Sequence, residues 1–276
     1  MPRYGQMVLG PAGSGKSHYC STMQNTAQVS RKRTIDVINL DPAAEHFDYQ
    51  PLADIRDLIC LEDVMEDEEL SFGPNGGLVF CMEFLLENLN WLEEAIGEAE
   101  DDYILFDLPG QIELYTHLPV MRRLTEALQG WNFRLAAVFL LDSHFMIDGG
   151  KFISGSTLAL TVMANLELPH VNVLSKIDLL DPKAKKRLDV YLEPDTRELT
   201  SAACMTSDFS NPRYARLTDA LAQVLDTYSL IKYYPLDVSR EETADELLLV
   251  IDNTIQFGED ADVKTEDQEE NDPDDD

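Results

Sequence analysis

The stretch Gly10-Pro11-Ala12-Gly13-Ser14-Gly15-Lys16-Ser17 follows a short apolar segment at 6–9 and precedes a helix-length segment. Its spacing fits G-x-x-x-x-G-K-[ST], the pattern of a glycine-rich loop that binds phosphates. A strand before the loop and a helix after it are what this chemistry requires, because backbone N–H groups at the helix N-terminus must converge on the anion. We expect Lys16 to bridge the β and γ phosphates and Ser17 to bind Mg²⁺. The nucleotide-binding residues predicted here are Gly13, Ser14, Gly15, Lys16, Ser17 and His18.

Short runs rich in Val, Ile, Leu and Phe recur along the chain, separated by helix-length amphipathic segments. These runs lie at residues 6–9, 35–40, 103–106, 134–141, 170–174 and 231–234. Near-continuous hydrophobicity is typical of strands buried on both faces, and alternation with helices indicates a parallel sheet. The sequence therefore predicts an α/β fold of the P-loop NTPase type, with a mostly parallel sheet flanked by helices on both faces.

Three stretches depart from this alternation. Residues 60–77 combine acidic side chains with Gly73-Pro74-Asn75-Gly76-Gly77, which predicts a turn or loop. Residues 181–212 carry three prolines and mixed charge, which predicts a helical insertion of short helices and loops. Residues 258–276 lack any apolar period and are dominated by acids, so we expect one domain over 1–257 followed by a disordered acidic tail.

The net negative charge of the chain limits the kinds of molecule that it is expected to bind. The chain has 52 Asp and Glu against 21 Lys and Arg, a net charge of −31, of which 258–276 carries −10 and the rest −21. Such a field repels phosphate backbones and anionic headgroups, so we expect neither direct nucleic-acid binding nor electrostatic docking on a membrane.

The apolar runs and the cysteines indicate where in the cell the protein is located. The longest apolar run, 135–141, is far shorter than the roughly 20 residues of a membrane-spanning helix, and the N-terminus shows no long apolar leader. Cys20, Cys60, Cys81 and Cys204 lie tens of residues apart, which favours reduced structural thiols over a zinc site or a disulfide framework. We therefore expect an intracellular protein.

Asp107 ends one of the apolar runs and begins Asp107-Leu108-Pro109-Gly110-Gln111. Open α/β sheets place ligand contacts at the carboxyl ends of their strands. Beside a phosphate loop, this aspartate fits a Walker B position that holds Mg²⁺; an ordinary strand-ending turn is the alternative.

Ser175-Lys176-Ile177-Asp178 follows the run at 170–174 and is related to the [NT]-K-x-D element that recognises guanine. A carboxylate at Asp178 can accept two hydrogen bonds from guanine, and adenine offers no matching donors. Ser175 stands where Asn is usual and cannot make all of its contacts; a surface turn is the alternative. Tyr234-Pro235-Leu236-Asp237 is the candidate for the last guanine-binding loop.

Taken together, these motifs resemble the GPN-loop GTPases. The Gly73-Pro74-Asn75 motif, the P-loop, Asp41-Pro42-Ala43, the segment from Asp107 and the Ser-Lys-Ile-Asp element stand in that family's order, and the match runs from about residue 3 to 257. Residues 39–45, 112–117 and 172–176 look most like the third of its eukaryotic branches.

The resemblance implies a Mg²⁺-dependent, dimeric GTPase. Asn75 would reach across the dimer to assist the partner's phosphate, while Asp41 and Gln111 would lie near the metal and the attacking water. The implied partners are a sister GPN-loop GTPase, with homodimers also open, and RNA polymerase II subunits or assembly factors. The implied role is assembly and nuclear import of that polymerase, in the cytoplasm with shuttling to the nucleus.

Two other classes of function remain open from the residues. A nucleotide-stabilised assembly chaperone with negligible turnover would use the same binding residues. A P-loop small-molecule kinase would need phosphate-clamping arginines in a lid, yet residues 143–170 contain none.

Overall fold

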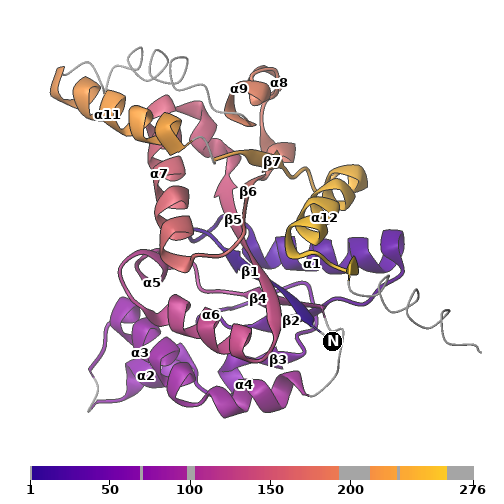
Figure 1. Cartoon of the computed structure of the whole chain (residues 1–276). Helices are drawn as coiled ribbons and strands as arrows, with labels where there is room; N and C mark the ends of the chain where they lie inside the picture. The colour runs from indigo at the N-terminus through magenta and orange to yellow at the C-terminus, as the bar shows by residue number, and fades with distance from the viewer. Residues whose placement is uncertain (1, 69–70, 98–102, 193–211, 229–230, 260–276) are drawn as a thin grey trace, which may run out of the picture.

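A computed structural model describes residues 2–68, 71–97, 103–192, 212–228 and 231–259 (Figure 1). Seven strands form one sheet in the order β3-β2-β4-β1-β5-β6-β7, and every neighbouring pair is parallel. The strands are β1 Arg3–Leu9, β2 Asp36–Asn39, β3 Ala53–Asp54, β4 Tyr103–Asp107, β5 Phe133–Asp142, β6 His170–Ser175 and β7 Tyr233–Pro235. The predicted α/β architecture is confirmed.

Helices cover both faces of this sheet. Figure 1 shows α1 and α12 on one side and α5, α6 and α7 on the other. The α-helices are α1 Lys16–Thr26, α2 Leu61–Glu66, α3 Pro74–Glu87, α4 Leu89–Ile96, α5 Glu113–Thr116, α6 Val120–Gly130, α7 Gly149–Leu166, α8 Pro182–Lys185, α9 Leu188–Leu192, α11 Pro212–Tyr228 and α12 Glu241–Ile255. A π-helical turn, η1 Ala27–Arg31, extends α1, and the 3₁₀ turns are η2 Ile55–Asp57, η3 Ser143–Ile147 and η4 Ile177–Leu179.

Two apolar layers hold the helices on the sheet. On one face, Met23 of α1 and Leu248 of α12 pack against residues of β1, β4 and β5 that point the same way. On the other face, Leu85 of α3, Leu124 of α6 and Val162 of α7 are buried in a second cluster. Burial on both faces is the reason that the strands read as continuous apolar runs.

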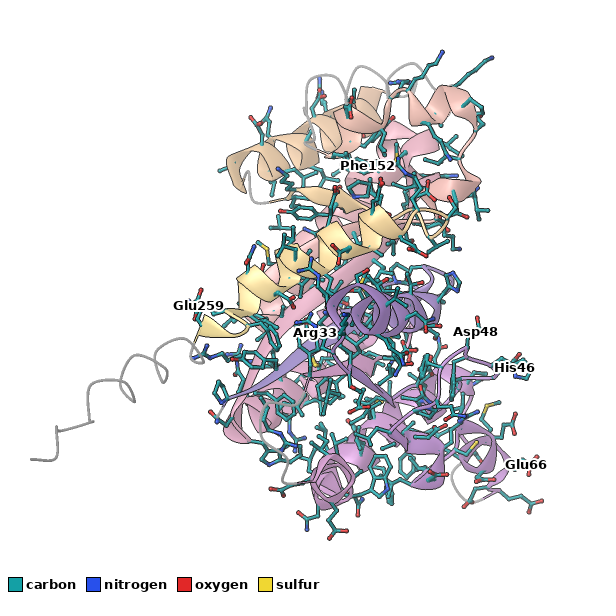
Figure 2. The ribbon with its side chains drawn as sticks, turned by 90° about the vertical axis from the view of Figure 1, so that its right-hand side faces the viewer. Arg33, His46, Asp48, Glu66, Phe152 and Glu259 are labelled. Carbon is teal, nitrogen blue, oxygen red and sulfur yellow. The ribbon has the colours of Figure 1, made fainter. Side chains whose placement is uncertain are left out.

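A polar chain passes through the first of these layers. Tyr19 of α1 donates a hydrogen bond to Gln6 Oε1 (2.6 Å), and Gln6 Nε2 donates to the Tyr103 hydroxyl (2.7 Å). Arg33, labelled beside α12 in Figure 2, donates to both carboxylate oxygens of Asp252 on that helix (2.8 and 2.7 Å). The first two bonds tie α1 to β1 and β4, and the contacts of Arg33 tie α12 to the segment that precedes β2.

The segment predicted as a loop at 60–77 is largely helical. Residues 61–66 form α2, and Gly73 is the N-cap of the 14-residue α3, with Pro74 at its first position. Proline is tolerated there because the first N–H groups of a helix have no intrahelical partner. A Cβ on Gly77 would lie 2.8 Å from Leu61 Cδ1, so this glycine allows α2 and α3 to approach closely.

Other sequence predictions are met in part. The two-residue strand β3 was not predicted, and β7 begins two residues later than the apolar run at 231–234. The predicted insertion at 181–212 contains α8 and α9, while 193–211 lie outside the described residues, as do 260–276 of the predicted tail.

Cys20, Cys60 and Cys81 are free thiols, as predicted, and Cys204 lies outside the described ranges. Among the helices of the described ranges, none has the length and apolar character needed to cross a membrane.

Candidate functional site

The loop between β1 and α1 is built by glycines in conformations that side chains disfavour. Gly13 (φ 75°) and Gly15 (φ 89°) are left-handed, and Gly15 is the N-cap of α1. A Cβ on Gly10 would lie 2.5 Å from the Leu140 carbonyl oxygen. The loop therefore follows the predicted strand and opens the predicted helix, with the N-terminal N–H groups of α1 directed to its concave side.

Lys16 lies beneath this loop. Its side chain is 8% exposed, and Nζ donates a hydrogen bond to the Gly10 carbonyl oxygen at 3.3 Å. Burial lowers the pKa of Lys16, and the charges of Asp107 and Asp41 oppose that shift. A buried cation between two carboxylates and a ring of backbone N–H groups is suited to the phosphates of a nucleotide.

Asp107 stands at the carboxyl end of β4, next to β1 in the sheet, and is 2% exposed. Its Oδ2 accepts a hydrogen bond from the Tyr49 hydroxyl at 2.7 Å, and its Oδ1 is buried with no partner among the described residues. Burial raises the pKa of Asp107, while the neighbouring hydroxyls of Ser17 and Tyr49 and the charge of Lys16 lower it. An orphaned carboxylate oxygen beside the Ser17 hydroxyl fits the oxygen ligands that Mg²⁺ prefers.

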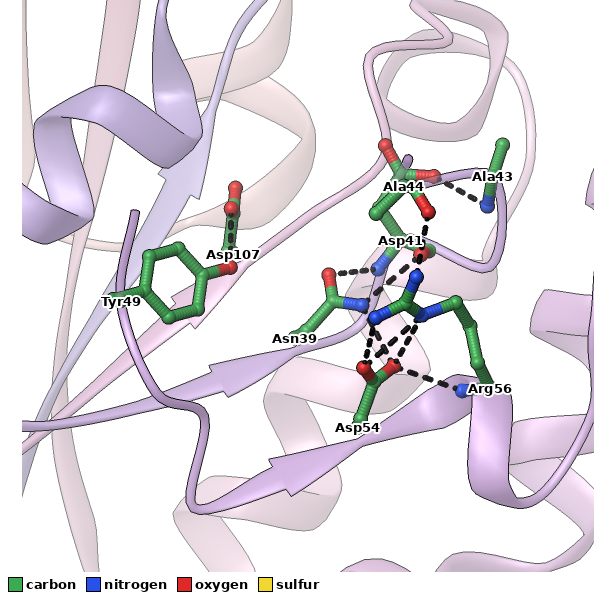
Figure 3. A network of polar contacts seen from close by, with 8 residues as sticks. All are labelled: Asn39, Asp41, Ala43, Ala44, Tyr49, Asp54, Arg56 and Asp107. Carbon is green, nitrogen blue, oxygen red and sulfur yellow. Dashed lines mark hydrogen bonds and ion pairs between the residues drawn. The ribbon is translucent and has the colours of Figure 1, made fainter. Parts of the chain in front are cut away.

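Asp41 follows β2 at the same edge (Figure 3). Its Oδ1 accepts a hydrogen bond from the Ala43 N–H at 3.0 Å, and its own N–H donates to Asn39 Oδ1 at 3.1 Å. Burial raises the pKa of Asp41, opposed by the Ala43 N–H and by Lys16. The structure thus brings Asp41, Asp107 and Lys16 together, as the motifs predicted.

The segment after β4 runs close against the P-loop. A Cβ on Gly110 would lie 2.7 Å from Ala12 Cα and 3.0 Å from Lys16 Nζ. The next residue, Gln111, has its side-chain Oε1 buried with no hydrogen-bond partner in the described chain. Gln111 therefore offers an unpaired acceptor one residue beyond the contact of Gly110 with the P-loop.

A cavity of about 230 Å³ opens on the other side of the loop. Its lining includes Gly15, His18, Ser175, Lys176, Asp178 and Leu236. Asp178 Oδ1 is buried with no partner among the described residues. Because an unpaired buried acceptor is costly, this oxygen fits a site whose ligand supplies the hydrogen-bond donors. Leu236 comes from the predicted last guanine-binding loop, whereas Asp237 accepts hydrogen bonds from the Ser239 N–H and hydroxyl.

Ser175 and Lys176 join this cavity to the P-loop. Ser175 Oγ donates to the Ser14 carbonyl oxygen (2.7 Å), and Lys176 Nζ donates to the Gly13 carbonyl oxygen and to Asp142 Oδ2 (2.9 Å). Ile177 is buried in the core, and its N–H donates to the Leu236 carbonyl oxygen at 3.4 Å. The Ser175–Ser14 and Lys176–Gly13 hydrogen bonds hold the predicted base-binding and phosphate-binding elements together.

Asn75 is an exposed residue in the first turn of α3, and no described residue forms a hydrogen bond with its amide. Gly73 and Pro74 are exposed beside it. The structure of one chain therefore presents the residues of the Gly-Pro-Asn motif to solvent, while the Gly73 carbonyl oxygen accepts a hydrogen bond from the Gly77 N–H at 2.8 Å.

Sequence reasoning missed two residues of the site, Tyr49 and Asp142. Asp142 ends β5, at the same edge as Asp107, and this strand-end position was a usable signal. Burial acts to raise the pKa of Asp142. The hydrogen bonds from the His144 N–H and from Lys176 outweigh burial, so the pKa of Asp142 is lowered. Tyr49 lies in the connection between β2 and β3 and belongs to no motif that could be recognised from the spacing of its residues.

An all-parallel sheet with a Gly-rich loop between β1 and α1, and with Lys16 and Asp107 beside it, defines a P-loop nucleotide-binding protein. The chain belongs to the GPN-loop GTPase family. It is 53% identical over 264 residues to GPN-loop GTPase 3 of Danio rerio, covering 96% of this chain and 92% of that protein. It is 44% identical to the protein of the same name in Saccharomyces cerevisiae, over 96% of both chains.

Two further comparisons concern a family model and the fold. Residues 8–257 match a family model described as "Conserved hypothetical ATP binding protein". The fold resembles the crystal structure of a GTPase in apo form from Pyrococcus abyssi, with a TM-score of 0.72, 23% identity, and coverage of 90% of this chain and 95% of that one.

Proposed function

We propose that this protein binds GTP together with Mg²⁺ and hydrolyses it. The observation that carries the choice of nucleotide is the unpaired, buried Asp178 Oδ1 in the cavity beside Gly15. Guanine supplies donors to such an oxygen and adenine does not, so a bound adenine would leave the carboxylate unpaired. The unpaired oxygen of Asp178 therefore favours GTP over the ATP that the family model's description names.

Each residue then has a task that follows from its position. Lys16 and the N–H groups of residues 13–17 bind the phosphates, and Ser17 and Asp107 would hold Mg²⁺. Mg²⁺ neutralises charge between the β and γ phosphates when it is bound. Gln111, whose Oε1 lacks a partner, accepts a hydrogen bond from the water that attacks the γ-phosphorus, while Asp41 is already engaged with the Ala43 N–H.

In the reaction, the water oxygen forms a bond to the γ-phosphorus and the bond to the β–γ bridging oxygen breaks. The products are GDP and inorganic phosphate, with the proton of the water passing to solvent or phosphate. Negative charge develops at the transferred group, and donors placed there accelerate such reactions. Asn75 of a partner subunit would be such a donor, supported by its exposure in the first turn of α3.

The cellular role that we propose is assembly and nuclear import of RNA polymerase II, in a dimer with a sister GPN-loop GTPase or with a second copy. The support is the resemblance of residues 39–45, 112–117 and 172–176 to one eukaryotic branch, together with identities of 44–53% to proteins of that branch. The cytoplasm with shuttling to the nucleus is the matching location.

Titration calorimetry with GTP, GDP and ATP in the presence of Mg²⁺ tests the nucleotide. We expect GTP to bind at least about 100-fold more tightly than ATP, and Asp178→Ala to remove that preference by weakening GTP alone. Asp181→Ala is the matched control, because Asp181 caps α8 nearby through the Lys183 and Ala184 N–H groups. Equal affinity for GTP and ATP in the wild-type protein would contradict the assignment.

A further inference from the structure

The Tyr49 phenol is buried against Asp107, although Tyr49 lies outside every motif. Its side chain is 6% exposed, and its hydroxyl donates to Asp107 Oδ2 at 2.7 Å (Figure 3). The contact joins residues 58 positions apart in the sequence. It therefore depends on the path of the whole connection between β2 and β3.

The two carboxylate oxygens of Asp107 differ in their hydrogen bonding. Oδ2 is occupied by the Tyr49 hydroxyl, whereas Oδ1 is buried with no partner and the carboxylate lies beside the Ser17 hydroxyl. A carboxylate that is free to rotate would exchange these two oxygens. A donor fixed on one of them holds the other in a constant direction, and this is how outer hydrogen bonds orient metal ligands.

The position of Tyr49 is itself held from several sides. Its ring stacks on Phe47, with centroids 4.6 Å apart and planes 10° from parallel, and the Arg56 guanidinium lies over Phe47 at 5.0 Å. Arg56 donates to both carboxylate oxygens of Asp54 and to the Ala44 carbonyl oxygen (2.9 Å), and Asp54 also accepts from Asn39 at 2.8 Å (Figure 3). This clamp anchors the connection to β2 and β3.

The neighbours of Tyr49 face the other way. Figure 2 shows the side chains of His46 and Asp48 projecting from the surface of the molecule, and both are exposed. The backbone of Asp48 is tied to α1, because Ser21 Oγ donates to its carbonyl oxygen at 3.3 Å. The connection thus spans from the clamp to α1 and turns only the phenol toward Asp107.

We propose that Tyr49 is a positioning residue for the metal: it holds the Asp107 carboxylate so that Oδ1 faces Mg²⁺ beside Ser17. This inference rests on the proposed binding of nucleotide with Mg²⁺. The phenol does not contact the nucleotide; it acts through Asp107. Its loss weakens the binding of Mg²⁺ and leaves the metal-free contacts between the P-loop and the phosphates unchanged.

The test uses Tyr49→Phe, which keeps the ring on Phe47 and removes only the hydroxyl. Binding of a fluorescent GDP analogue is measured first in EDTA and then as Mg²⁺ is titrated in. We expect the half-saturating Mg²⁺ concentration to rise about 10-fold, the lower end of the range for lost outer hydrogen bonds, and the affinity in EDTA to stay within about twofold.

Tyr233→Phe is the matched control. It also removes one buried tyrosine hydroxyl, which contacts Ser156 Oγ of α7 at 3.0 Å, and we expect no change in the Mg²⁺ titration. An unchanged or lower half-saturating Mg²⁺ concentration in Tyr49→Phe overturns the proposal, and so does an equal loss of affinity in EDTA. Wild-type protein that binds no nucleotide would refute the proposed function itself, a result distinct from either of these.

Discussion

The Ser175 hydroxyl donates a hydrogen bond of 2.7 Å to the carbonyl oxygen of Ser14. The donor ends β6 and the acceptor lies inside the P-loop, so one bond connects the proposed base-binding element with the proposed phosphate-binding element. Ser175 is 3% exposed, and its hydroxyl also reaches the Leu141 carbonyl oxygen at 3.3 Å. The short side chain of Ser175 therefore makes its hydrogen bonds within the protein.

Ser175→Ala is expected to lower the free energy of unfolding by about 1 kcal/mol, because a buried carbonyl oxygen loses its partner. The same change should weaken GTP binding several-fold, since the P-loop loses a support. Chemical denaturation and calorimetry measure the two effects. Ser156→Ala removes a buried hydroxyl that contacts Tyr233 and should show the loss of stability alone; equal GTP affinity in both variants would argue against the coupling.

Lys16→Ala is expected to weaken nucleotide binding at least about 100-fold, because the charged donor nearest the phosphates is removed. The fold should persist, since the only described hydrogen bond of the ammonium is the 3.3 Å contact with the Gly10 carbonyl oxygen. Calorimetry gives the affinity, and circular dichroism checks the fold. Lys183→Ala, on exposed α8, serves as the control, and retained GTP affinity in Lys16→Ala would refute the site.

Asn75→Ala is expected to slow single-turnover GTP hydrolysis about 100-fold without weakening GTP binding, because a lost donor to the developing charge acts on the transition state. An equimolar mixture with Lys16→Ala tests whether Asn75 acts across a dimer. In a homodimer, random pairing makes about half of the dimers mixed, and each mixed dimer has one of its two sites with an intact P-loop facing an intact Asn75. About a quarter of the wild-type rate should therefore return. Full activity of Asn75→Ala alone would exclude the role.

His170 makes stability depend on pH. Burial lowers the pKa of His170 to about 4, and the Asn172 side chain opposes that shift. Between about pH 6.5 and 4 the unfolded chain binds a proton that the folded chain does not, so folding is disfavoured as pH falls. The expected loss is about 2 kcal/mol at pH 5 relative to pH 7.5.

Denaturant unfolding at the two pH values checks this expectation. His170→Phe removes the titrating group and keeps a ring beside Phe139, whose centroid lies 6.2 Å from the imidazole. The variant should lose about 2 kcal/mol less than the wild-type protein between pH 7.5 and 5. Identical pH profiles would show that His170 has the same pKa in the folded and the unfolded chain, contrary to this prediction.

Much of the fold could be predicted because its strands are buried on both faces. The apolar runs at 103–106 and 134–141 became β4 and β5 with only small changes at their ends. The strand β3 could not be predicted, because Ala53 and Asp54 are too few to show any period. The helical start at Pro74 was misread, since Gly and Pro interrupt most helices but are accepted in a first turn.

The site shows the same division. The placement of Lys16, Asp107 and Asp178 at one edge of the sheet could be predicted, because each stands at or after the carboxyl end of a predicted parallel strand. The placement of Tyr49 could not, because its contact with Asp107 arises from the path of a connection and from the stacking of Phe47 beneath Arg56. Tertiary structure alone brings such a residue to the site.

The approach of Gly110 to Ala12 and Lys16 leaves no room for a side chain between the P-loop and the segment that follows β4. Any larger residue at position 110 would have to displace the backbone of the loop or the ammonium of Lys16. The path that carries the chain from Asp107 to Gln111 is therefore open only to glycine at this point.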